Sequence, residues 1–162
     1  MRDREPTRRD RLIRERVHDP YKARRHLRDP TVCIGCGAVY RDGRWRWGDP
    51  PADAHRDHCP ACRRQRDRDP AGLVSLSGDY LRAHRTEILE LVRDVEAREK
   101  AEHPIQRILG MEEQEDGLLV STADQHLARA IGEALHHAHH GALDYHYVEE
   151  DARLRVRWTR SA

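Results

Sequence analysis

The chain contains two short cysteine motifs, CIGC at residues 33–36 and CPAC at residues 59–62. Paired cysteines at this spacing are typical of zinc sites, because a tight knuckle turn brings both thiolates of a pair onto one ion. Gly37 follows the first pair and Pro60 lies within the second, as knuckle turns favour. Four thiolates fill a tetrahedron and leave no position for water, which favours a structural ion over a catalytic one. We therefore predict one structural zinc ion bound by Cys33, Cys36, Cys59 and Cys62.

The segment between the two motifs predicts a β-hairpin. Its strands are expected at 39–41 and 44–47, joined at Asp42-Gly43, a dipeptide that favours a type I′ turn. An inserted loop is expected from Asp49 to Asp57, and a short basic helix or turn after the second cysteine pair. His55 and His58 lie beside Cys59, but the four cysteines already complete the ligand set. Residues 31–70 are thus predicted to form a zinc-ribbon-type module.

From residue 71 onward, the apolar pattern changes to regular secondary structure. A helix is expected from a cap at Ser77 or Asp79 to about Glu102, followed by strands at 105–113 and 118–122. Thr122 and Gln125 fit a capping box for a second helix that ends at Gly141. A final hairpin is expected at 143–148 and 154–158. The predicted fold class is α+β, with an α/β domain over 71–162 ordered helix-strand-strand-helix-strand-strand.

Residues 1–30 are predicted to form a basic flexible arm, with one short helix from about Thr7 to His18. Charge is divided unevenly along the chain. Residues 1–70 carry 19 Lys or Arg against 12 Asp or Glu, a net of +7, whereas residues 71–162 carry 11 against 17, a net of −6. Such a division indicates that the basic half binds a polyanion and that the acidic half does not.

The basic residues, with two tryptophans for base stacking, predict a nucleic-acid-binding surface. The alternative is a solvated charged surface whose aromatic residues pack the ribbon hairpin. Trp45 and Trp47 are expected to share one strand face, which fits either a stacking platform or a core cover. The residues predicted to bind nucleic acid are Arg8, Arg9, Arg11, Arg14, Arg16, Arg24, Arg25, Arg44, Trp45, Arg46, Trp47, Arg63 and Arg64.

Composition predicts a cytoplasmic protein with no membrane segment, because no run of 18 apolar residues occurs and the first 30 residues lack an apolar signal core. The cluster His136, His137, His139 and His140 is a second candidate metal site, but imidazoles at a predicted helix C-terminus also suit the helix dipole. The chain has no Gly-rich phosphate loop, nucleophile elbow or HExxH motif. The sequence therefore predicts a protein that is not an enzyme.

The two cysteine pairs, in CIGCG and CPAC, and the stretch DGLLVSTADQHLARAIGEAL together resemble a known family. It is the large-ribosomal-subunit export adaptor family of eukaryotes and archaea, linked by name to nonsense-mediated mRNA decay. The chain looks most like its short bacterial relatives. In the second stretch, the residues that match the family are Asp116, Gly117, Leu118, His126, Ala128, Ile131 and Leu135. The resemblance covers about residues 31–140 and implies association with a ribosomal subunit or its rRNA.

These observations are compatible with three functions. The first is a zinc-stabilised RNA-binding protein on the ribosome or a subunit, acting in its stability, inhibition or assembly, with the acidic domain contacting a ribosomal protein. The second is a DNA-binding zinc-ribbon transcriptional regulator. The third is a metal-dependent hydrolase that uses the His cluster, which lacks an evident general base and open coordination position.

Overall fold

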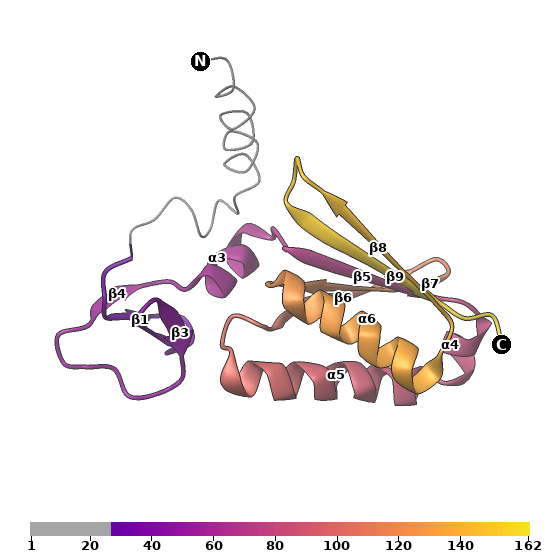
Figure 1. The fold of residues 1–162 in the computed structure, drawn as a ribbon, viewed down its shortest axis with the longest axis horizontal. Helices are drawn as coiled ribbons and strands as arrows, with labels where there is room; N and C mark the ends of the chain where they lie inside the picture. Colours follow the sequence, from indigo (N-terminus) through magenta and orange to yellow (C-terminus); the bar gives the residue numbers. More distant parts are fainter. Residues whose placement is uncertain (1–26) are drawn as a thin grey trace, which may run out of the picture.

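The computed structural model describes residues 27–162. The predicted helix at 7–18 and most of the basic arm lie outside these residues. Two β-sheets follow each other along the chain: a four-stranded sheet near the cysteines and a five-stranded sheet formed by the rest (Figure 1). The α+β class is confirmed, with a four-cysteine cluster beside N-terminal strands and then a mixed sheet with helices.

The small sheet has the strand order β3-β2-β1-β4. The predicted hairpin is confirmed, with β2 at Val39–Arg41 and β3 at Arg44–Arg46. Asp42 and Gly43 both have positive φ, at 53° and 79°, which is the signature of the type I′ turn. The expected loop at 49–57 is partly wrong, because its end forms β4, His55–Asp57, which pairs in parallel with β1, Thr31–Cys33. The basic segment after β4 is the helix α3, Pro60–Asp67.

The large sheet has the order β6-β7-β5-β9-β8. Its central strand β5, Gly72–Ser77, was not predicted, so the second half begins with a strand and not with a helix. β5 pairs antiparallel with β7, Gly117–Thr122, and parallel with β9, Arg153–Thr159. Val74 is the register partner of both Val120 and Val156, which places three buried valines in one row. That row forms the middle of the core.

The helix expected from Asp79 to Glu102 is two helices, α4 at Asp79–Ala83 and α5 at Arg85–Glu102. Gly78 separates α4 from β5 with φ 106°, and a Cβ on it would lie 2.0 Å from the carbonyl oxygen of Arg160. The close approach of the two backbones therefore requires glycine here. β5 ends at Ser77, so neither Ser77 nor Asp79 caps one continuous helix.

Strand β6 spans Ile108–Gln114, three residues later than the predicted start. The helix α6, Gln125–His139, was predicted, but its cap was not. Asp124 is the N-cap, and its Oδ1 accepts a hydrogen bond from the Leu127 amide at 3.2 Å. Thr122 instead donates to the Asp124 carbonyl, and Gln125 donates to the Ala152 carbonyl, so the predicted capping box is wrong.

The final hairpin is confirmed, with β8 at Ala142–Val148 and β9 beside it. Helices α5 and α6 lie on one face of the large sheet (Figure 1). Within residues 27–162, no helix packs across the opposite face, although the end of α3 borders it. The buried apolar residues of the sheet point to the helical face, where Trp158 is fully buried and donates its indole N–H to the His140 carbonyl at 2.6 Å. No helix within residues 27–162 is both long and apolar enough to cross a membrane.

Candidate metal centre

The two cysteine pairs come from different local structures. Cys33 ends β1, and a tight turn follows in which the Gly37 amide donates to the Cys33 carbonyl at 2.9 Å. Gly37 has φ 83°, so the predicted role of this glycine is confirmed. Cys59 is the N-cap of α3, with Pro60 at its first turn, and its Sγ accepts from the Cys62 amide at 3.4 Å. A strand end and a helix start therefore present the four thiols to one point.

The four Sγ atoms lie within 4.8 Å of one another. Zinc–sulfur bonds of about 2.3 Å in a tetrahedron require sulfur–sulfur separations of about 3.8 Å. The Sγ atoms of Cys33 and Cys62 are 3.7 Å apart, and those of Cys36 and Cys59 are 3.8 Å apart. The chemistry and spacing of these donors fit a tetrahedral thiophilic ion, so the cluster can bind one metal ion.

Backbone amides surround the sulfurs. Gly35 and Cys59 both donate to the Cys33 Sγ, at 3.3 and 3.2 Å. Gly35 must be small, because a Cβ there would lie 2.9 Å from the Cys62 Sγ. Such N–H···S bonds stabilise thiolates and orient metal ligands from the surrounding shell.

The second half of the fold places the charged side chain of Arg107 against the cluster, and no sequence pattern singles this residue out. It is 8% exposed, and its guanidinium donates to the Sγ atoms of Cys36 at 3.2 Å and of Cys59 and Cys62 at 3.6 Å. Its Nε donates to the Pro104 carbonyl at 3.1 Å, which fixes the direction of the side chain. A tetrathiolate zinc site has a formal charge of −2, and the guanidinium offsets half of it.

The protonation of the thiols reflects these contacts. The hydrogen bond from the Cys59 thiol, helped by Arg107, lowers the pKa of Cys36 to about 4 against the effect of burial. The same hydrogen bond, together with burial, raises the pKa of Cys59, and burial raises that of Cys62. Burial by itself would lower the pKa of Arg107, but its hydrogen bond to Cys36 and the nearby thiolates outweigh that effect and raise it. The site therefore already favours a thiolate beside a cation.

The two ribbon tryptophans make different contacts in the fold. Trp45 is half-buried against the cysteine cluster, with its ring 5.4 Å from that of Tyr40. Trp47 lies after the end of β3, is 38% exposed, and donates its indole N–H to the Lys100 carbonyl at 2.7 Å. The predicted strand end at residue 47 is wrong by one position, because β3 ends at Arg46 and Trp47 lies outside it.

The other predicted nucleic-acid-binding residues divide into three groups. Arg44 and Arg46 are exposed on β3. Arg63 bonds to Asp57 at 2.6 Å and to the His58 carbonyl, while the buried Arg64 bonds to the Asp69 carbonyl at 2.8 Å. Those of the arm lie outside the described residues: Arg8, Arg9, Arg11, Arg14, Arg16, Arg24 and Arg25.

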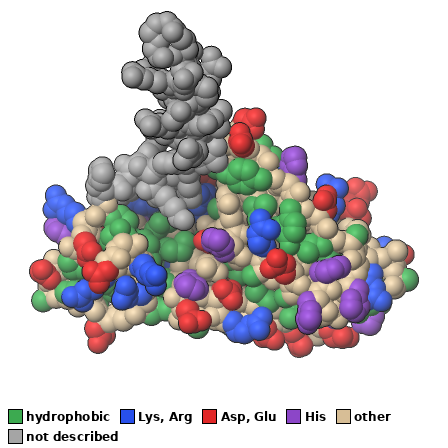
Figure 2. Space-filling model, in the orientation of Figure 1, with side chains coloured by type: hydrophobic (Ala, Val, Ile, Leu, Met, Phe, Trp, Pro, Cys, Tyr) green, Lys and Arg blue, Asp and Glu red, His purple; other side chains and the backbone are tan. Residues whose placement is uncertain are grey.

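The histidines at the end of α6 do not converge on a common point. In residues 27–162, the only group of three or more His, Cys, Asp or Glu side chains close enough to hold an ion is the cysteine cluster. His139 Nδ1 lies 2.9 Å from the Tyr80 hydroxyl, and His136 Nδ1 lies 3.1 Å from the Gly141 carbonyl oxygen. Histidine side chains gather on the surface at the end of the molecule where α6 ends (Figure 2).

No protein-family model, curated protein or solved structure matches the chain. The fold and the four cysteines together define a zinc-ribbon-like metal site, which is followed in the chain by a mixed sheet with helices.

Proposed function

We propose that this chain is a zinc-stabilised RNA-binding protein that associates with the ribosome or a ribosomal subunit and catalyses no reaction. Zinc is the proposed ion because four thiolates near tetrahedral spacing suit it and leave no position for substrate water. The role is structural: Cys33, Cys36, Cys59 and Cys62 join a strand end to a helix start in a segment with few buried apolar residues. A bound ion would cross-link the end of β1 to the start of α3 and so stabilise the ribbon.

The observation that carries the RNA part of this proposal is the position of the positive charge. The half of the chain that contains the cysteine centre has a net charge of +7, and the other half has −6. Phosphate contacts supply most of the non-specific affinity of nucleic-acid-binding proteins, and a zinc ribbon holds basic residues in fixed positions. We propose association with a ribosomal subunit because the cysteine motifs and residues 116–135 resemble the ribosomal-subunit export adaptor family. The acidic half is proposed to contact a basic ribosomal protein.

The two other functions lack a comparable observation. α3, the helix of the described ribbon, is eight residues long, and its Arg63 and Arg64 are bound to Asp57 and Asp69, so they are not directed to base edges. A hydrolase at the His cluster would need ligands that converge, and within residues 27–162 those histidines do not.

Sedimentation of a cell lysate on a sucrose gradient tests this proposal. The chain is expected in ribosomal or subunit fractions at low salt and in the free pool at high salt, because phosphate contacts weaken as salt rises. Cys36→Ser is the control for dependence on the folded ribbon. Recovery only in the free pool at low salt, or preferential binding of duplex DNA over rRNA, would contradict the proposal.

A further inference from the structure

No helix of the described residues 27–162 packs across one face of the large sheet, here called the open face, and its side chains differ from those of the covered face. Strand residues alternate between the two faces, so the residues between the buried ones point outward. On β9, these outward residues are three arginines, Arg153, Arg155 and Arg157. On the neighbouring β5 and β7, they are the uncharged Leu73, Ser75, Leu119 and Ser121. The open face therefore has a neutral middle and a basic strand beside it.

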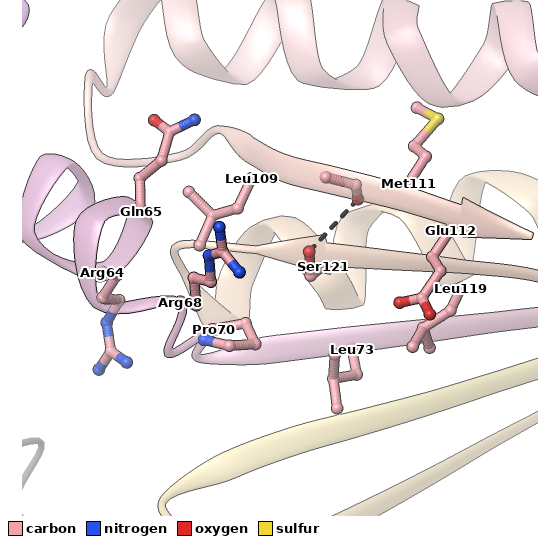
Figure 3. A pocket seen from close by; sticks show the side chains of 11 residues that line it. Arg64, Gln65, Arg68, Pro70, Leu73, Leu109, Met111, Glu112, Leu119 and Ser121 are labelled. Carbon is pink, nitrogen blue, oxygen red and sulfur yellow. Dashed lines mark hydrogen bonds between the residues drawn. The ribbon is translucent and has the colours of Figure 1, made fainter.

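Two adjoining hollows lie along this face. The first, of about 460 Å³, is bordered by α3, β5, β6 and β7, and the second, of about 570 Å³, extends over β5, β9 and β8. Both are lined by Leu73 and Leu119, so they form one continuous depression. Figure 3 shows the first hollow, where the Arg68 side chain extends toward Leu109 and Ser121 from the end of α3.

Basic side chains stand at both ends of this depression. Arg68, at the C-cap of α3, and Arg157, on β9, are exposed, and neither forms an ion pair with another residue of the described chain. Arg155 forms an ion pair with Asp151, with a nitrogen–oxygen distance of 3.1 Å. The acidic lining residues are Glu112 and Asp144, on the outer strands β6 and β8. Asp144 is the register partner of Arg157, yet no ion pair joins them within the described residues.

We propose that this depression binds the sugar–phosphate backbone of single-stranded RNA, with Arg68 and Arg157 as phosphate contacts. The inference rests on the proposed function and adds a site to it. An extended peptide pairs with a sheet at an edge, through main-chain groups, whereas a face offers only side chains. Arginine matches phosphate bidentately, and the leucine and serine floor suits ribose without selecting a base. In RNA-recognition modules, single-stranded RNA lies across an open sheet face.

The test measures binding of a fluorescein-labelled single-stranded oligouridylate to the full chain by anisotropy across a salt series. The variant is Arg68→Gln combined with Arg157→Gln. The control is Arg93→Gln combined with Arg98→Gln, which makes the same charge change on exposed positions of α5, the opposite side of the sheet. Two lost phosphate contacts should make the log–log salt slope less negative by about 1.4 and weaken binding about tenfold near physiological salt. The control should stay near the wild type, and Arg68→Lys with Arg157→Lys should keep most of the slope.

The outcomes separate this site from the proposed function. If the wild type binds RNA and the open-face variant binds with equal affinity and slope, the open face is not the site, although RNA binding stands. If the wild type binds neither oligouridylate nor rRNA, both proposals fail. If the wild type binds polyglutamate as tightly as RNA, the depression is selective for acidic polypeptide as much as for nucleic acid, and the RNA assignment is overturned.

Discussion

The Nη2 atom of Arg107 lies 3.2 Å from the Sγ atom of Cys36, although 71 positions separate the two residues in the chain. Arg107 stands just before β6 of the large sheet, and Cys36 belongs to the first knuckle of the ribbon. This contact joins the metal centre to the second half of the fold. If a zinc ion is bound, half of the −2 charge of the tetrathiolate centre would be offset by this residue from outside the ribbon.

We expect Arg107→Ala to weaken zinc binding about 10–100-fold, the usual effect of removing a partner that supports metal ligands. The loss arises because the thiolates keep their negative charge without a buried cation. Competition with a chromophoric zinc chelator measures it. Arg107→Lys should give an intermediate affinity, since an ammonium keeps the charge but cannot reach three sulfurs with a planar fork. Unchanged affinity in Arg107→Ala, compared with the exposed control Arg93→Ala, would show that the contact is only packing.

Protein purified without chelators should contain about one zinc ion per chain. Removing it, or substituting Cys36→Ser, should unfold the ribbon while α5 and α6 stay largely helical, because a separate core of buried aliphatic residues holds them. Elemental analysis gives the stoichiometry, and far-UV circular dichroism before and after chelation gives the retained helix. Zinc content near zero would contradict the first expectation. A complete loss of helix on chelation would show instead that the two parts fold as one cooperative unit.

Gly132→Ala should destabilise the protein, although alanine in a helix interior is ordinarily better than glycine by about 0.5–1 kcal/mol. A Cβ at Gly132 would lie 2.6 Å from Cγ1 of Val156 and 3.0 Å from Cδ1 of Leu143, so these side chains or α6 itself must shift. We expect a net loss of about 1–3 kcal/mol in the free energy of unfolding, measured by urea denaturation. Glu133→Ala, at the next and exposed position, should change it by less than about 0.5 kcal/mol. A more stable Gly132→Ala would mean that the α6–β9 packing is looser than observed.

Removal of residues 1–30 should flatten the salt dependence of RNA binding. These residues hold 11 Lys or Arg against 6 Asp or Glu, a net of +5 out of the +7 of the basic half. Each phosphate contact on a single strand adds about −0.7 to the log–log slope, so the truncated chain should have a smaller slope and lower affinity at low salt. Titration against ribosomal subunits at several salt concentrations measures both. Equal slopes for the two chains would exclude the arm from the binding surface.

The local patterns of the sequence were enough to predict the features that depend on near neighbours. The cysteine pairs, Gly37 and the Asp42-Gly43 turn are each decided within a few residues, by ligand spacing or by positive φ. The apolar repeat of α6 is likewise local, because a helix presents every third or fourth residue to the same side.

Tertiary structure alone decided the features that depend on distant partners. The sequence pattern does not predict β5, because the apolar Leu73 interrupts the apolar–polar alternation that Val74 and Leu76 begin. The segment is a strand because it pairs with β7 on one side and β9 on the other. The split between α4 and α5 follows from the backbone of Arg160 against Gly78. Arg107 lies at the cysteine thiols only because segments far apart in the sequence meet in the fold. For the same reason, Arg157 lines the same hollow as Leu73 and Leu119. Long-range contacts of this kind leave no periodic trace in the chain, because the partner of each residue is set by the packing of whole elements.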